Sequence, residues 1–133
     1  MRHTVKEISI NKEATIISAL KQMDACHIKL LIVLSDGLFH SLLSIGDIQR
    51  AIISNKSLED SVASILRRNV NVARTSDSKE KILRFLKERR SEFMPIVDEM
   101  NNIVDVIFWE DISTYKEAHV KSPFNLPVII MAG

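Results

Sequence analysis

The sequence predicts an α/β fold built from two similar halves that pack together as one unit. Each half contains the same succession of helix, strand, turn, strand and helix. The halves align with a constant offset of 64, because Val33 matches Val97 and Asp47 matches Asp111 (97 − 33 and 111 − 47). Such a repeat determines the fold class. One half is too small to cover both faces of a sheet, so we expect the two halves of this 133-residue chain to share one core.

The first half begins with a helix that Thr15 caps, because the apolar residues after Thr15 recur on one helical face. A strand rich in branched side chains follows over residues 28–33. Residues 35–37 (Ser-Asp-Gly) form a turn, and the chain returns as a strand over 38–43. Ser44 then opens a helix with isoleucines on one side.

The second half repeats this order after a short extra helix. Its predicted elements are that short helix beginning at Ser57, a strand over 69–73, a long helix capped by Ser76, a strand over 93–98, a turn at Asn101-Asn102, a strand over 103–109 and a helix over 110–118.

Charge and hydropathy exclude several classes of protein. The formal net charge of +1 gives no electrostatic basis for binding nucleic acid or an anionic membrane. The longest apolar run, residues 30–34, is far too short to cross a bilayer, and the first residues lack the apolar core of a signal peptide. We therefore expect a cytoplasmic protein.

Few residues in the chain are suited to catalysis. Cys26 is the only cysteine, which excludes an internal disulfide, and it is better interpreted as a small buried side chain than as a nucleophile. The four histidines are dispersed, and the three glycines cannot build a phosphate-binding loop. We expect no metal site, no required cofactor and no enzymatic activity of this chain.

Ser44 and Asp47 carry the main functional question. A serine at the N-cap with an acid three residues later forms a capping box, which stabilises a helix without any ligand. The same helix N-terminus can also bind an anion. Lys29 and Arg50 are the basic residues expected near this joint, although each also fits an ordinary surface charge. Phe108 and Trp109 could stack on a base, but core or helix-interface packing explains them better.

The ordered doublet, with "GDIQRAI" and "EDISTYKEA" in matching places, resembles a pair of cystathionine-β-synthase (CBS) domains. The resemblance implies two tandem β-α-β-β-α motifs related by a pseudo-two-fold axis, with motif 1 over 1–55 and motif 2 over 56–119. Many members bind an adenine nucleotide between the strands and regulate an attached enzyme, channel or transporter. Others only dimerise, commonly through their helices.

The resemblance also implies which residues bind the ligand. In motif 1 the family's glycine, hydroxyl and acid positions fall on Ser41, Ser44 and Asp47, where the hydroxyl would contact phosphate and the carboxylate would bind ribose. In motif 2 they fall on Asp105, Phe108 and Asp111, of which only Asp111 matches, so no usual second site is expected. The family's proline is present as Pro95 and is replaced by Leu31 in motif 1. The candidate ligand-binding residues are thus Ser44, Asp47, Ser41, Lys29, Leu31 and Asp111.

The last residues, 120–133, carry a separate resemblance. "LPVIIMAG" is similar to the first strand of a sugar-nucleotide nucleotidyltransferase of the mannose-1-phosphate guanylyltransferase type, which leads into a glycine-rich loop. A chance apolar tail is the alternative. We therefore expect a linker and the first strand of a larger enzyme's catalytic domain here.

Together these patterns give two hypotheses for function. In the first, the chain is a regulatory module that senses AMP, ADP or ATP and modulates an attached sugar-phosphate nucleotidyltransferase. In the second, it is a ligand-free homodimerisation module that assembles that enzyme.

Overall fold

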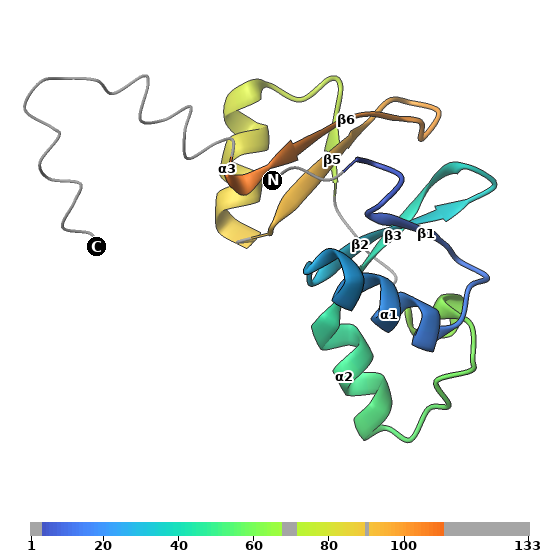
Figure 1. The fold of residues 1–133 in the computed structure, drawn as a ribbon. Helices are drawn as coiled ribbons and strands as arrows, with labels where there is room; N and C mark the ends of the chain where they lie inside the picture. Colours follow the sequence, from blue (N-terminus) through green and yellow to red (C-terminus); the bar gives the residue numbers. More distant parts are fainter. Residues whose placement is uncertain (1–3, 68–71, 90, 111–133) are drawn as a thin grey trace, which may run out of the picture.

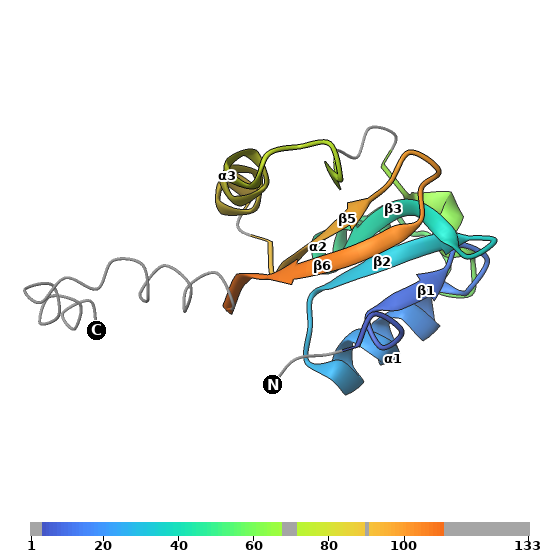
Figure 2. The same ribbon diagram turned by 90° about the horizontal axis from the view of Figure 1, so that it is seen from above.

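The computed structural model describes residues 4–67, 72–89 and 91–110, and within them the fold is a mixed α+β arrangement of two three-stranded sheets. Figure 1 shows α1 and α2 on the outer face of the first sheet and α3 beside the second sheet. Seen from above, in Figure 2, strands of both sheets lie between α1 and α3. The predicted fold class of two packed halves is confirmed.

The first half contains one sheet of order β1-β2-β3, with β1 parallel and β3 antiparallel to the central strand. Its elements are β1 (Ser9–Asn11), α1 (Ile16–Cys26), β2 (Leu30–Ser35), β3 (Leu38–Ser44), α2 (Ile45–Ile53) and the 3₁₀ helix η1 (Val62–Ile65).

The second half repeats this sheet as β4-β5-β6, again with one parallel and one antiparallel pair. Its elements are β4 (Ala73–Arg74), α3 (Lys79–Arg89), β5 (Phe93–Val97) and β6 (Ile103–Phe108). Trp109 and Glu110 continue from β6 in helical conformation, and the rest of the predicted helix over 110–118 lies outside the described residues.

Local signals place most element boundaries. The Thr15 hydroxyl caps α1 by accepting from the Ser18 amide, as predicted. The turn residue Gly37 has a φ of 80°, which glycine adopts without strain. The predicted cap at Ser76 is wrong by two residues: the hydroxyl of Ser78 accepts from the Lys81 amide, because α3 begins only at Lys79.

Strand pairing corrects the alignment of the two halves. Ile10 pairs with Val33, and Ala73 pairs with Ile96, so the first two strands of each sheet are related by 63 residues (73 − 10 and 96 − 33). The third strands are related by 64 (105 − 41), since Ser41 pairs with Val33 and Asp105 with Ile96.

The difference arises in the second hairpin, where the turn is one residue longer than that of the first. The predicted equivalence of Val33 with Val97 is therefore wrong by one position. For the same reason the counterpart of Pro95 is Ile32 and not Leu31.

A shared core joins the halves, and its fully buried members include Leu31 and Val33 from the first sheet and Phe93 and Met94 from the second. Two polar contacts add to it. The amide of Phe39 donates to the Asn101 carbonyl at 2.8 Å, and the Lys29 amide donates to Glu92 Oε1 at 2.7 Å. Among the described residues, no helix is long and apolar enough to span a membrane.

The segment before the second sheet is fastened to the first half. The amide of Ile16 donates to the Asp60 carbonyl at 3.0 Å, and the Val62 amide donates to the Ala14 carbonyl at 2.8 Å. This segment, with η1, therefore packs beside the N-terminus of α1 and carries Arg67 toward α2.

Candidate functional site

The first strand-to-helix joint, residues 41–50, is built around a capping box. β3 runs directly into α2, and Ser44 at the N-cap is extended with a φ of −102°. Its hydroxyl accepts from the Asp47 amide at 3.2 Å, while its own amide donates to Asp47 Oδ2 at 2.9 Å. Both predicted residues thus lie together, and the structural role predicted for them is present.

Asp47 is more than a capping residue, because two arginines bind its carboxylate. The side chain is only 4% exposed. Arg50 Nη2 donates to Oδ1 at 2.6 Å from the same helix. From beyond η1, Arg67 donates through Nε to Oδ1 at 3.0 Å and through Nη2 to Oδ2 at 3.4 Å. The buried charge is therefore paired on both oxygens.

The environment of Asp47 favours its ionised form. Burial raises the pKa of this carboxyl, but hydrogen bonds from the Ser44 amide, from Arg67 and from the Ser44 hydroxyl outweigh that effect. The pKa of Asp47 is accordingly below the ordinary 3.8. At neutral pH the joint contains a fixed negative charge between two guanidinium groups.

A shallow pocket of about 320 Å³ lies between α2 and η1, beside this ion cluster. Three of its lining side chains are cationic, namely Arg50, Lys56 and Arg67, and Asp47 is the acid among them. Ser54 and Ser64 add hydroxyl groups to the wall. The pocket therefore has an excess of positive charge and suits an anionic group.

The other predicted ligand-binding residues are not all brought to this surface. Ser41 is 3% exposed, and its hydroxyl donates to the Leu42 carbonyl at 3.4 Å. Lys29 is exposed and lies next to the joint, since its carbonyl accepts from the Ile45 amide. Leu31 has no exposed surface and belongs to the core. Asp111 lies outside the described residues.

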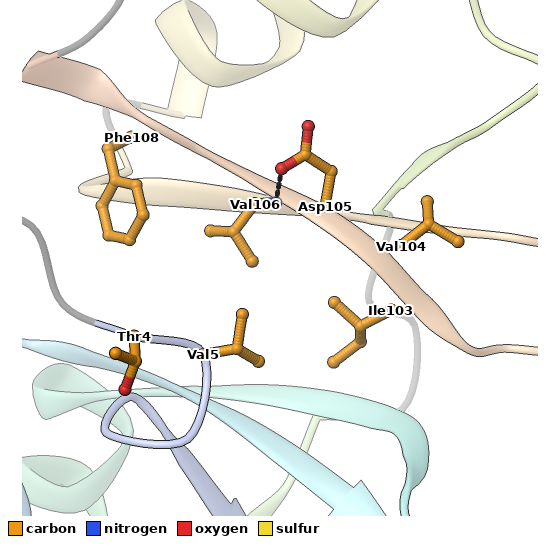
Figure 3. A pocket seen from close by; sticks show the side chains of 7 residues that line it. All are labelled: Thr4, Val5, Ile103, Val104, Asp105, Val106 and Phe108. Carbon is orange, nitrogen blue, oxygen red and sulfur yellow. Dashed lines mark hydrogen bonds between the residues drawn. The ribbon is translucent and has the colours of Figure 1, made fainter.

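The second joint, residues 105–110, has a different character. Phe108 occupies the position of Ser44 and packs against Phe93, with ring centroids 5.9 Å apart. A pocket of about 270 Å³ lies between β6 and the N-terminal segment, lined in part by Thr4, Val5 and Phe108. In Figure 3 the carboxylate of Asp105 points away from Thr4 and Val5 and accepts from the Val106 amide at 2.8 Å.

A larger pocket of about 480 Å³ lies at the end of the second joint. Trp109, which is 42% exposed, lines it together with Phe108, His27 and Cys26. Core packing thus describes Phe108 but not Trp109. Within the described ranges, no three His, Cys, Asp or Glu residues are arranged to hold a metal ion.

Arg67 is the site residue that sequence reasoning missed. It is 20 residues from Asp47, and the contact depends on how η1 packs against α2. Only the structure relates Arg67 to the repeat: the offset of 63 between β1 and β4 relates it to Thr4 (67 − 4), which lines a pocket together with Phe108. No short motif contains both Arg67 and Asp47.

Comparison with solved structures gives the fold. The CBS domain pair/ACT domain protein of Thermotoga maritima is 20% identical, with a TM-score of 0.69 over 86% of this chain and 93% of that one. The CBS domain pair of protein MJ0100, in complex with 5′-methylthioadenosine and S-adenosyl-L-methionine, is 21% identical, with a TM-score of 0.66 over 84% and 89%. The cytosolic domain of the Mg²⁺ channel MgtE in complex with ATP is 20% identical, with a TM-score of 0.66 over 84% of this chain and 46% of that one.

Neither comparison by sequence finds a relative. No protein-family model matches the chain. No curated protein matches it either. The chain has the fold of a tandem CBS domain pair, and the expectation of two such motifs is confirmed at the level of fold.

Proposed function

We propose that this chain is a regulatory module that binds an adenine nucleotide at the first joint. The observation that carries the proposal is the buried, ionised Asp47 at the N-terminus of α2, next to a pocket with three cationic side chains. The carboxylate can accept hydrogen bonds from ribose hydroxyls, and the helix N-terminus with the nearby cations can bind phosphate. Two of the similar folds contain ATP or adenosyl compounds.

Regulation follows only if the ligand prefers one conformation of the module. The polar contacts between the halves, through Lys29 with Glu92 and Phe39 with Asn101, are where a shift at the first joint would reach the second half. We further propose that the regulated partner is an attached sugar-phosphate nucleotidyltransferase of the mannose-1-phosphate guanylyltransferase type. The support for that partner is the sequence of residues 126–133.

Calorimetric titration with AMP, ADP and ATP tests the binding proposal. We expect one of them to bind more tightly than millimolar and Asp47→Ala to abolish that binding. Asp105→Ala is the matched control, because Asp105 is an exposed aspartate in the second joint, where it occupies the position of Ser41, and its carboxylate accepts from the Val106 amide. Absence of binding by all three nucleotides would refute the sensor function, and unchanged binding by Asp47→Ala would refute the assigned site.

A second candidate function is assembly, which exposed apolar residues at the end of α2 favour. Ile53 is 79% exposed and Ile52 is 47% exposed. A homodimer that buries this end of α2 would remove both side chains from water. Sedimentation of the chain should then show a dimer with or without nucleotide, and Ile53→Glu should give monomers. Val104→Glu, on β6, should leave the mass unchanged, and a monomeric wild-type chain would refute assembly.

A further inference from the structure

The carboxylate of Asp47 has no acceptor position left for a ligand. A carboxylate offers about four lone-pair positions. In this structure Oδ1 accepts from Arg50 and from Nε of Arg67, while Oδ2 accepts from the Ser44 amide and from Nη2 of Arg67. A ribose hydroxyl can bind Asp47 only if one of these donors leaves.

Arg67 is the donor best placed to leave. The Ser44 amide belongs to the backbone of the capping box, and Arg50 lies one helical turn from Asp47 with a short contact of 2.6 Å. The contacts of Arg67 with the carboxylate are longer, at 3.0 and 3.4 Å, and Arg67 comes from a separate segment beyond η1. Removal of Arg67 would leave Asp47 still paired with Arg50.

A departing guanidinium is best compensated by another anion. Arg50, Lys56 and Arg67 itself line the pocket, so its charge remains positive when Arg67 releases Asp47. A phosphate group placed there would accept from the guanidinium and replace the carboxylate as its partner. A neutral nucleoside brings hydroxyls for Asp47 but no partner for Arg67.

In the described part of the second half, the position equivalent to Arg67 carries no charge. Thr4 stands where the 63-residue offset places the counterpart of Arg67, and Phe108 replaces Ser44. Thr4 carries no charge, and its hydroxyl accepts from the Glu7 amide at 3.2 Å. The arginine is therefore a specific feature of the first joint and not a general requirement of the fold.

We propose that Arg67 determines the ligand specificity of the first joint: it occupies Asp47 in the free protein and moves to the ligand's phosphate on binding. The joint then selects phosphorylated adenosine over adenosine itself. This inference rests on the proposed function, and it adds the residue that distinguishes phosphorylated from neutral ligands.

Calorimetry with AMP and adenosine tests the exchange. We expect the wild-type chain to bind AMP about tenfold more tightly than adenosine, which is the effect of one lost charge-assisted contact. Arg67→Thr introduces the residue found at the equivalent position, Thr4. This variant should bind AMP more weakly and adenosine more tightly, which brings the ratio of the two affinities near one. Arg67→Lys should give an intermediate ratio, because an ammonium group cannot replace the bidentate fork. Arg84→Thr, an exposed arginine on α3, is the control and should keep the wild-type ratio.

The outcomes separate this inference from the proposed function. If the wild-type chain binds AMP and Arg67→Thr leaves the ratio unchanged, the role of Arg67 is refuted and nucleotide binding stands. If neither protein binds either ligand, the inference is refuted, and the titrations with ADP and ATP decide the proposed function. If only Arg67→Thr binds, Arg67 blocks the site and does not move to the phosphate, so the inference is refuted. Should Arg67→Thr fail to fold by circular dichroism, the Arg67→Lys ratio decides, and a wild-type ratio there overturns the inference.

Discussion

The two strand-to-helix joints occupy equivalent places in the fold and are stabilised by different forces. The first depends on a buried carboxylate with its hydroxyl and two arginines. The second depends on aromatic packing between Phe93 and Phe108. The same backbone turn can thus be fixed by charge-assisted hydrogen bonds or by apolar burial, and among the described residues the two versions present different groups to a ligand.

The largest loss of stability should come from a variant of the second joint, which apolar packing stabilises. Phe93 is 1% exposed, so Phe93→Ala should lower the free energy of unfolding by about 3–5 kcal/mol. Chemical denaturation followed by circular dichroism measures this. Leu30→Ala, at the equivalent and less buried position of the first sheet, should cost less. An equal or larger loss for Leu30→Ala would contradict the assignment of apolar packing mainly to the second joint.

At the first joint, loss of the Asp47 carboxylate should reduce stability most. Asp47→Ala leaves the Ser44 amide without its side-chain partner and two arginines without their anion, so we expect a loss of about 1–3 kcal/mol. Asp105→Ala should change stability by less than about 0.5 kcal/mol, since Asp105 is exposed. Comparable losses for the two variants would remove the proposed difference between the joints.

Removal of the capping hydroxyl should have a smaller effect. Ser44→Ala removes the acceptor of the Asp47 amide, which typically costs about 1 kcal/mol. Thermal unfolding measures the change, and Ser44→Thr, which keeps a hydroxyl, should restore most of it. A loss by Ser44→Thr equal to that of Ser44→Ala would show that the hydroxyl does not cap α2.

The smallest change should be the pH dependence near pH 4. Because the pKa of Asp47 is lowered on folding, its ionisation contributes stability above the unfolded value of 3.8, and the contribution is lost as pH falls through the folded value. The stability difference between the wild-type chain and Asp47→Asn should be constant from pH 7 to 5 and begin to shrink near pH 4. A difference that grows on acidification would show that the pKa is raised instead.

Local patterns predicted the parts of the fold that depend on neighbouring residues. The Ser44 and Asp47 spacing identified a capping box, and apolar runs bounded by turn residues identified β2, β3, β5 and β6 to within a few positions. The capping hydroxyl of Ser78, just before α3, was missed because Ser76 offers the same hydroxyl two residues earlier. Both serines have a side chain suited to capping a helix, so the choice between them depends on where α3 begins in the folded chain.

The structural features that depend on long-range contacts could not be predicted from local sequence patterns. The contact of Arg67 with Asp47 requires η1 to lie against α2, which four backbone hydrogen bonds to residues 12–17 enforce. The repeat offset changes from 63 to 64 inside the second hairpin, and a single alignment with one offset hides that extra residue. Whether Ser41, Ser44, Lys29 and Asp111 bind a ligand stays a prediction.

The longer turn of the second hairpin has a practical consequence for experiments on this module. Met100, at that tip, is 73% exposed, while the neighbouring Asn101 carbonyl bonds to Phe39 of the other half. A fluorophore placed at position 100 would sit outside both strand ladders and beside the junction of the halves. Its emission could therefore report in real time whether the two halves shift relative to each other when a solute is added.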